Sequence, residues 1–312
     1  RGVLLFGGYQ WDAMSGAEIA QGHNSAFVDK QNRSFVVYHT RFSNGGEGHQ
    51  VRVHQLFLND EGWLMAAPFE FDGETITDAA IASKASIADA DIAGDYQFMR
   101  HQYGQNTKAK AFETPVNITL NADGTITGAE KGTWKRTAGT DYIHLTINDV
   151  VYRGVLVKQT IDYTNIPAIA ISALSSSSGS VALGQNNFTY QQEVWAVKAD
   201  AKAAIKYTLS KMTLPFSDGA TLNAAPSLPV QGKMGANISW KSSDTSILTD
   251  EGKVKGKGKV TMTMTISKDE YEYVKDYSLN IDAEAEETTP VYYPVSAQKN
   301  TTSAWWTNFS AD

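Results

Sequence analysis

The stretch "QGHNSAFVDKQNRSFVVYHTRFSNGGEGHQVRVHQLFLNDEGW" runs from Gln21 to Trp63 and carries four of the six histidines in this 312-residue chain. Between the turn residues "DKQN", "SNGGEG" and "NDEG", apolar and polar residues alternate at period two. This alternation predicts the antiparallel strands "NSAFVD", "SFVVYHTRF" and "QVRVHQLFL". Together with "VLLFGGY" (residues 3–9), they give four expected strands in one sheet, which is the size of one β-propeller blade.

Such a sheet has an apolar face that its own four strands cannot cover. The chain starts at Arg1 with an expected strand already under way, and no signal-peptide pattern follows. We therefore expect the chain to begin in the middle of a larger gene product.

Composition narrows the class of protein. A length of 312 residues predicts several domains, and a net charge of −7 argues against a nucleic-acid partner. No run approaches the ~18 consecutive apolar residues of a membrane span. The absence of cysteine excludes disulfides and thiolate metal sites.

Two further regions show β patterns and one shows a helix. Turn pairs at Asp123-Gly124 and Asn148-Asp149 separate short alternating runs, which predicts hairpins within a barrel or sandwich. Residues 200–214 have helix formers behind a possible cap at Asp200. In "VTMTMTI" (residues 260–266) the apolar side chains alternate with threonines, as on one face of a two-sheet sandwich.

The motifs "GHNS" (22–25), "YHTRF" (38–42) and "HQVRVHQLFLNDEGW" (49–63) resemble the last propeller blade of family 43 glycoside hydrolases, in the bacterial endo-α-1,5-L-arabinanase branch. The run from "GDYQFMRH" to "VWAVK" (94–198) resembles the β-barrel that follows the propeller in larger arabinanases. "SWKSSDTSILTDEGKVKG" (239–256) resembles bacterial immunoglobulin-like modules, and the last residues resemble the start of a laminin-G-like lectin domain.

The resemblance implies an all-β chain that contains the last blade of a five-bladed β-propeller, a β-barrel or sandwich and an Ig-like β-sandwich. The expected boundaries are 1–75 for the incomplete propeller, 88–198 for the barrel, 199–283 for the Ig-like domain and 284–312 for a linker and the start of the lectin-like domain. A bacterial protein that is secreted or held at the cell surface is implied as well.

Family 43 enzymes hydrolyse glycosidic bonds with inversion, using an Asp base, a Glu acid and a second Asp that orients the acid. Two such carboxyl groups flank the bond ~6.5–9.5 Å apart. In the family all three lie on blades upstream of the "GHNS" motif, so no catalytic residue is carried over and the chain alone is expected to be inactive. Glu47 lies in a glycine-rich loop, where solvated carboxylates are far commoner than catalytic ones.

The resemblance assigns His23 to an ion site in the central channel, with a calcium ion bound mostly by water. Calcium prefers oxygen ligands, so a single imidazole is a weak ligand. The alternative for a lone strand histidine is a hydrogen-bonded core residue. Gly22, Asn24 and Ser25 are expected to shape the site or orient His23.

Two arginines on adjacent expected strands leave alternatives open. Arg41 and Arg52 could each bind a sugar hydroxyl or a catalytic carboxylate, or form an ion pair between strands. The other histidines of this segment, His39, His49 and His54, have no clear metal-ligand spacing. Trp134, Trp195 and Trp240 are expected in the core.

The implied partner is arabinan or an arabino-oligosaccharide, together with the missing N-terminal propeller blades. Two alternatives stay open. One is a non-catalytic carbohydrate-binding or spacer fragment. The other is a different family 43 specificity, such as an arabinofuranosidase or a xylosidase, because the pocket is built from all the blades.

Overall fold

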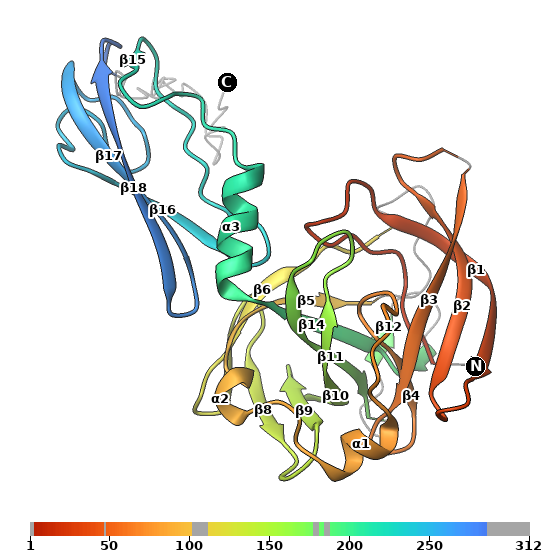
Figure 1. The fold of residues 1–312 in the computed structure, drawn as a ribbon. Helices are drawn as coiled ribbons and strands as arrows, with labels where there is room; N and C mark the ends of the chain where they lie inside the picture. The colour runs from red at the N-terminus through yellow and green to blue at the C-terminus, as the bar shows by residue number, and fades with distance from the viewer. Residues whose placement is uncertain (1–2, 47, 102–111, 177–180, 184–187, 286–312) are drawn as a thin grey trace, which may run out of the picture. The chain divides into compact units, whose positions relative to one another are not determined.

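The computed structural model describes residues 3–46, 48–101, 112–176, 181–183 and 188–285. These residues form mostly strands with few helices (Figure 1), which confirms the all-β expectation. The expected lectin-like start falls almost entirely outside the described residues. The chain forms two compact units: Arg1–Leu214 with Pro229–Trp240 and Thr263–Lys275, and Pro215–Leu228 with Lys241–Met262 and Asp276–Asp312.

The opening segment forms an antiparallel sheet in the order β1-β2-β3-β4. Its strands are β1 (Glu18–Val28), β2 (Ser34–Phe42), β3 (His49–Leu58) and β4 (Leu64–Ala66). The prediction of strands at 34–42 and 50–58 is confirmed. The prediction of a strand at "VLLFGGY" is wrong: this segment makes only isolated bridges, at Leu4 and Tyr9, and the short β4 is the fourth strand.

A closed β-barrel follows, with the strand order β10-β11-β14-β5-β6-β7-β8-β9. Its strands are β5 (Gly94–Arg100), β6 (Val116–Leu120), β7 (Thr125–Gly128), β8 (Gly132–Arg136), β9 (Tyr142–Ile147), β10 (Val150–Thr160), β11 (Pro167–Ser175) and β14 (Glu193–Ala199). Closure removes exposed sheet edges, which would otherwise pair with other chains.

The predicted hairpin turns are present. Asn148 and Asp149 both have positive φ, at 50° and 65°, as a two-residue turn between β9 and β10 requires. Strand β9 alternates as predicted, because Ile143, Leu145 and Ile147 are fully buried inside the barrel.

Short elements flank the barrel. The short strands β12 (Val181–Leu183) and β13 (Phe188–Tyr190) pair with each other. Two short helices, α1 (Asp78–Ser83) and α2 (Asp89–Ile92), precede the barrel and were not predicted. The helix predicted at 200–214 is α3 (Ala201–Lys211), and the side chain of Asp200 caps it by accepting from the amide of Ala203 at 2.8 Å.

The last sheet has the order β15-β18-β17-β16. Its strands are β15 (Thr221–Leu222), β16 (Asn237–Ser242), β17 (Gly258–Lys268) and β18 (Tyr271–Ile281). As predicted, Val260, Met262, Met264 and Ile266 of β17 face a buried side, and the threonines between them are half-buried.

The first sheet packs its inner face against the outside of the barrel. Val36, Tyr38 and Leu56 of the sheet share one buried cluster with Val157 and Trp195 of the barrel. Each such side chain contributes about 1.5–3 kcal/mol when fully buried. The sheet and the barrel therefore share a core in addition to the barrel's separate interior core.

We call the contact between the first sheet and the outside of the barrel the seam. The buried carboxyl group of Glu193 links the two sides of the seam beside Trp195. Oε1 of Glu193 accepts hydrogen bonds from the amide of Ala66 at 2.8 Å, from the hydroxyl of Ser172 at 2.8 Å and from the indole of Trp195 at 3.0 Å. Burial raises the pKa of Glu193 well above its usual value. The carboxyl group therefore acts as a structural link between β4 and the barrel.

A second polar cluster, which we call the Arg52 network, lies at the edge of the seam. Nε of Arg52 contacts the carboxylates of Glu18 at 3.1 Å and Glu70 at 2.8 Å, and Nη2 donates to the hydroxyl of Tyr163 at 2.9 Å. The carboxylate of Asp162 accepts from the amide of Glu70 at 3.1 Å. Asp162 and Tyr163 lie in the turn between β10 and β11, so the network joins the sheet to the barrel.

Three carboxyl groups surround one guanidinium in this network. Burial raises the pKa of Glu18 and of Glu70, although Arg52 acts in the opposite direction. Burial, followed by the nearby charge of Glu70, raises the pKa of Asp162 to about 8. Asp162 therefore keeps its proton at neutral pH, which reduces the repulsion among the three acids.

The Gly132→Ala substitution should destabilise the barrel. A Cβ at Gly132 would overlap the carbonyl oxygen of Thr146 on the neighbouring strand, so backbone would have to move. We expect a loss of about 2 kcal/mol or more in thermal unfolding. A Cβ at Gly48 would make only an ordinary 3.5 Å contact, so Gly48→Ala should stay within about 0.5 kcal/mol. Equal effects would contradict the close approach of β8 to β9.

The Asp162→Asn substitution should flatten the pH dependence of stability. The pKa of Asp162 is about 8 in the folded state against a usual value of 3.8, so the folded protein holds a proton that the unfolded chain releases. Stability therefore falls as pH rises from about 4 to about 8, by a few kcal/mol in order of magnitude. Urea unfolding of the variant should show a smaller slope and higher stability at pH 8.

Asp123 supplies the control, because hydrogen bonds from Thr125 lower the pKa of this exposed carboxyl. Asp123→Asn should leave the slope between pH 6 and pH 8 unchanged. An Asp162→Asn variant with the same slope as the unsubstituted protein would show that Asp162 does not hold a proton in this range.

Candidate functional site

His23 lies on a distorted part of the edge strand β1. The register with β2 shifts twice, between Ile19 and Gly22 and between Gly22 and Ser25, so that β1 has one extra residue at each shift. Two residues next to these bulges have positive φ, Ala20 at 54° and His23 at 49°. Left-handed backbone is unfavourable for residues other than glycine, and it persists only where surrounding contacts impose it. Bulges of this kind often redirect a side chain beside a functional site.

Several contacts hold the distorted segment. The side-chain amide of Gln21 donates to the carbonyl oxygens of Gly7 at 3.2 Å and Glu18 at 3.3 Å. The hydroxyl of Thr40 donates to the carbonyl oxygen of Ile19 at 3.1 Å. The bulged strand is thus fixed from the preceding segment and from β2.

The outer face of the sheet gathers three histidines. The rings of His23 and His39 lie 5.7 Å apart and those of His39 and His49 lie 4.7 Å apart, both with edge-to-face geometry. Nε of Arg41 donates to Nε2 of His49 at 2.9 Å, so this ring nitrogen carries no proton. Partial desolvation, and then the neighbouring His49, His23 and Arg41, lower the pKa of His39.

The sequence predicted His23, Gly22, Asn24, Ser25 and Arg41 as site residues, and all five lie on the neighbouring strands β1 and β2. His23, Asn24 and Ser25 are exposed, and a Cβ on Gly22 would meet nothing within 4 Å. No sequence pattern added His39 and His49 to this set. Their pairing positions opposite Gly22 and Arg41 bring them together. Glu47 lies outside the described residues.

The calcium site expected at His23, in which water supplies most of the ligands, stays a prediction. Within the described ranges no group of three His, Cys, Asp or Glu side chains could hold a metal ion. The ring next to His23 is another imidazole, whereas calcium prefers six to eight oxygen ligands. His23 could supply one ligand at most, so the described residues do not by themselves form a calcium site.

Arg52 and His54, to which the sequence analysis assigned no single role, have structural roles. Arg52 is only 8% exposed and lies in the Arg52 network, so the ion-pair interpretation holds for it. His54 is fully buried, and its Nδ1 lies 2.7 Å from the carbonyl oxygen of Ala67, so Nδ1 carries the proton. Burial lowers the pKa of His54 to about 4, which keeps the ring neutral.

The tryptophans follow the expectation in two cases. Trp195 and Trp240 are buried, while Trp134 is half-buried and donates its indole N–H to the carbonyl oxygen of Asn121 at 2.8 Å.

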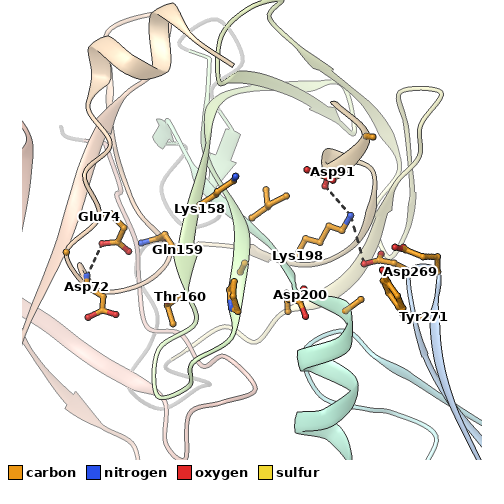
Figure 2. Close-up of a pocket in the computed structure, with 18 residues that line it drawn as sticks. Asp72, Glu74, Asp91, Lys158, Gln159, Thr160, Lys198, Asp200, Asp269 and Tyr271 are labelled. Carbon is orange, nitrogen blue, oxygen red and sulfur yellow. Dashed lines mark hydrogen bonds and ion pairs between the residues drawn. The ribbon is translucent and has the colours of Figure 1, made fainter. Parts of the chain in front are cut away.

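A cavity of about 750 Å³ lies elsewhere in the first unit (Figure 2) and takes no lining residue from β1, β2 or β3. Its polar side chains largely hold the fold. Asp269 accepts from the amide of Asp95 at 3.0 Å, Asp200 caps α3, and Lys198 donates to the carbonyl oxygen of Asp91 at 3.1 Å. The open, charged lining differs from the mostly apolar lining of typical ligand pockets, so we keep the outer face of the first sheet as the candidate site.

In the part of the chain that the structure describes, no helix is long and apolar enough to cross a membrane.

Two family models match the chain. Residues 68–184 match the C-terminal lipocalin-like domain of family 43 glycoside hydrolases, and residues 199–284 match an atrophied bacterial Ig domain. The chain is similar to the extracellular endo-α-(1→5)-L-arabinanase of Thermotoga petrophila, with 43% identity over 146 residues, which is 45% of this chain and 28% of that protein. It is also similar to the extracellular endo-α-(1→5)-L-arabinanase 2 of Bacillus subtilis, with 36% identity over 184 residues, 58% of this chain and 37% of that protein.

Solved structures give the same result. The family 43 YxiA protein of Bacillus licheniformis matches with a TM-score of 0.51 and 34% identity, over 63% of this chain and 39% of that one. The endo-1,5-α-L-arabinanase of T. petrophila matches with a TM-score of 0.50 and 35% identity, over 64% and 39%. The chain spans between 28% and 39% of the length of these relatives. The chain is therefore similar to the C-terminal part of these family 43 relatives, and it carries matches to a lipocalin-like C-terminal domain and to a bacterial Ig domain.

Proposed function

We propose that this chain supplies the last propeller blade and the adjoining barrel of a secreted bacterial hydrolase that cleaves α-1,5-linked L-arabinan. Sheet β1–β4 is the blade, and His23 on its bulged edge strand faces the central channel. The observation that carries this proposal is the double bulge with left-handed backbone at Ala20 and His23, in a chain similar to arabinanases. Strain of this kind clusters at functional sites.

The acid and the base of an inverting hydrolysis come from parts of the enzyme other than these residues. Raised carboxyl pKa values can mark a general acid. Here the carboxyl groups with strongly raised pKa values are Asp162 and Glu193, and both lie in the seam between sheet and barrel. Neither lies on the outer face with His23, so neither can flank a glycosidic bond there. The proposal therefore places the acid and the base on the other blades of a complete propeller.

We propose that this chain would hold a calcium ion only through His23. His23 would provide a single ligand, and water or other parts of the enzyme would provide the remainder, since calcium takes six to eight oxygen ligands and no group of three metal-binding side chains is present among the described residues. The imidazoles of His39 and His49 and the guanidinium of Arg41 would then line the same region of the channel and offer donors to sugar hydroxyls.

The His23→Ala substitution should impair arabinan cleavage. The assay is release of reducing ends from linear arabinan by the protein that contains this chain and a complete propeller. We expect kcat/KM to fall by about 10- to 100-fold, as for residues that support a metal or its neighbours. The exposed side chain of His23 should leave the melting temperature nearly unchanged.

His144 is the matched control, because this barrel histidine contacts Asp60 at 2.6 Å and lies away from the bulged strand. His144→Ala should cost some stability but retain activity within about twofold. Equal activity of His23→Ala and the unsubstituted protein would remove His23 from the site.

Binding of arabinan without any cleavage by the complete protein would favour a carbohydrate-binding role. Cleavage of only another pentoside would favour a different family 43 specificity.

A further inference from the structure

Strand β1 is at the edge of its sheet, where it pairs with β2 and forms a bridge to Tyr9 at Glu18 (Figure 1). Two bulges interrupt that pairing around His23. An edge strand with an interrupted ladder has fewer backbone hydrogen bonds to define its path. Side-chain contacts at the start of the strand therefore add to the backbone bridge between Glu18 and Tyr9 in holding the unfavourable conformations of Ala20 and His23.

The carboxyl group of Glu18 makes two of these side-chain contacts. Glu18 is the first residue of β1 and is only 1% exposed. Its Oε1 contacts Nε of Arg52 at 3.1 Å, and its Oε2 accepts from the hydroxyl of Tyr38 at 3.1 Å. A carboxylate held by a buried guanidinium and a buried hydroxyl fixes the backbone that leads into the bulge.

The position of Arg52 depends in turn on the barrel. Its Nη2 donates to the hydroxyl of Tyr163 at 2.9 Å and to Oε1 of Gln50 at 2.7 Å. Its Nε also contacts Glu70, whose amide is held by Asp162. Two residues of the turn between β10 and β11 thus support the arginine that holds Glu18.

The backbone of Tyr163 is in the left-handed region. Its φ is 63°, which is unfavourable for a bulky aromatic residue, and its side chain is 57% exposed, so apolar burial contributes little. The turn is closed by the amide of Ile161 donating to the carbonyl oxygen of Ile166 at 2.9 Å. The specific contact that this strained residue makes across the seam is its hydroxyl on Arg52.

We propose that the β10–β11 turn of the barrel is a positioning element for the candidate site. Through Asp162 and Tyr163 it holds Arg52, Arg52 holds Glu18, and Glu18 sets the bulged path of β1 that directs His23. The inference rests on the proposed function for what His23 does, but the mechanical link stands on the contacts themselves. A barrel that follows the propeller in sequence would then contribute to the site without touching the substrate.

NMR spectroscopy of the 312-residue chain tests this link. The Asp162→Ala/Tyr163→Phe variant removes the side-chain contacts of the turn with the Arg52 network. We expect the imidazole signal of His23 to shift and the exchange broadening of residues 20–24 to rise about threefold or more, as a strand that samples a second path would show. The single variant Tyr163→Phe removes only an exposed hydroxyl and should show a smaller change at the same residues.

Tyr96→Phe is the matched control. The hydroxyl of Tyr96 donates to the carbonyl oxygen of Ile92 at 2.7 Å within the barrel, so this variant also loses one hydrogen bond but does not touch the Arg52 network. It should lower the melting temperature without changing the His23 signal. The proposal is overturned if His23 and residues 20–24 respond equally in the Tyr96 and Tyr163 variants, or in neither.

An arabinan assay separates this inference from the proposed function. If the complete protein does not cleave arabinan, the proposed function fails and the NMR result still decides whether the turn positions β1. If the complete protein is active, Tyr163→Phe should lower kcat/KM about threefold or more while Tyr96→Phe leaves it within about twofold.

Discussion

The packing of the first sheet against the outside of the barrel is the interaction on which the rest of this structure depends. Trp195 lies at its centre, with the ring of His101 at 4.1 Å, the ring of His54 stacked at 6.2 Å and its indole N–H donating to the carbonyl oxygen of Ala66 at 3.0 Å. A four-stranded sheet cannot cover its own apolar face. The barrel covers the inner face here, and His23 lies on the opposite, outer face of the sheet.

Polar groups make this seam specific. Glu193 from the barrel, and His54 and Arg52 from the sheet, are buried, and Asp162 of the barrel is half-buried. Their hydrogen bonds fix one arrangement of the two surfaces. Apolar side chains alone would tolerate sliding of one surface on the other. Buried polar groups do not, because a displaced partner leaves an unsatisfied group that costs about 1–3 kcal/mol.

Local pattern predicted much of the fold. Alternation located β2, β3 and the hairpin β9–β10, and the cap at Asp200 located α3. It failed for "VLLFGGY", because an apolar run of this length is equally compatible with an irregular segment buried against other elements. The run instead contributes Phe6, whose ring lies 5.6 Å from that of Trp195.

The candidate site was predictable only in part. The resemblance of "GHNS" identified His23, and strand pairing then added His39 and His49. The Arg52 network could not be predicted, because Glu18 lies 34 residues before Arg52 and Tyr163 lies 111 residues after it. Alternation places a residue on a face of its own strand, but it does not say which distant turn will reach that face.

Native-state hydrogen exchange of the 312-residue chain tests most directly whether the first sheet and the barrel share one core. If the sheet and the barrel form one cooperative unit, the slowest amides of β2 and β3 should open with the same free energy, and with the same denaturant dependence, as those of β10 and β11. Exchange of β2 and β3 at a clearly lower free energy, with the barrel amides still protected, would show that the sheet separates from an intact barrel and would contradict this account.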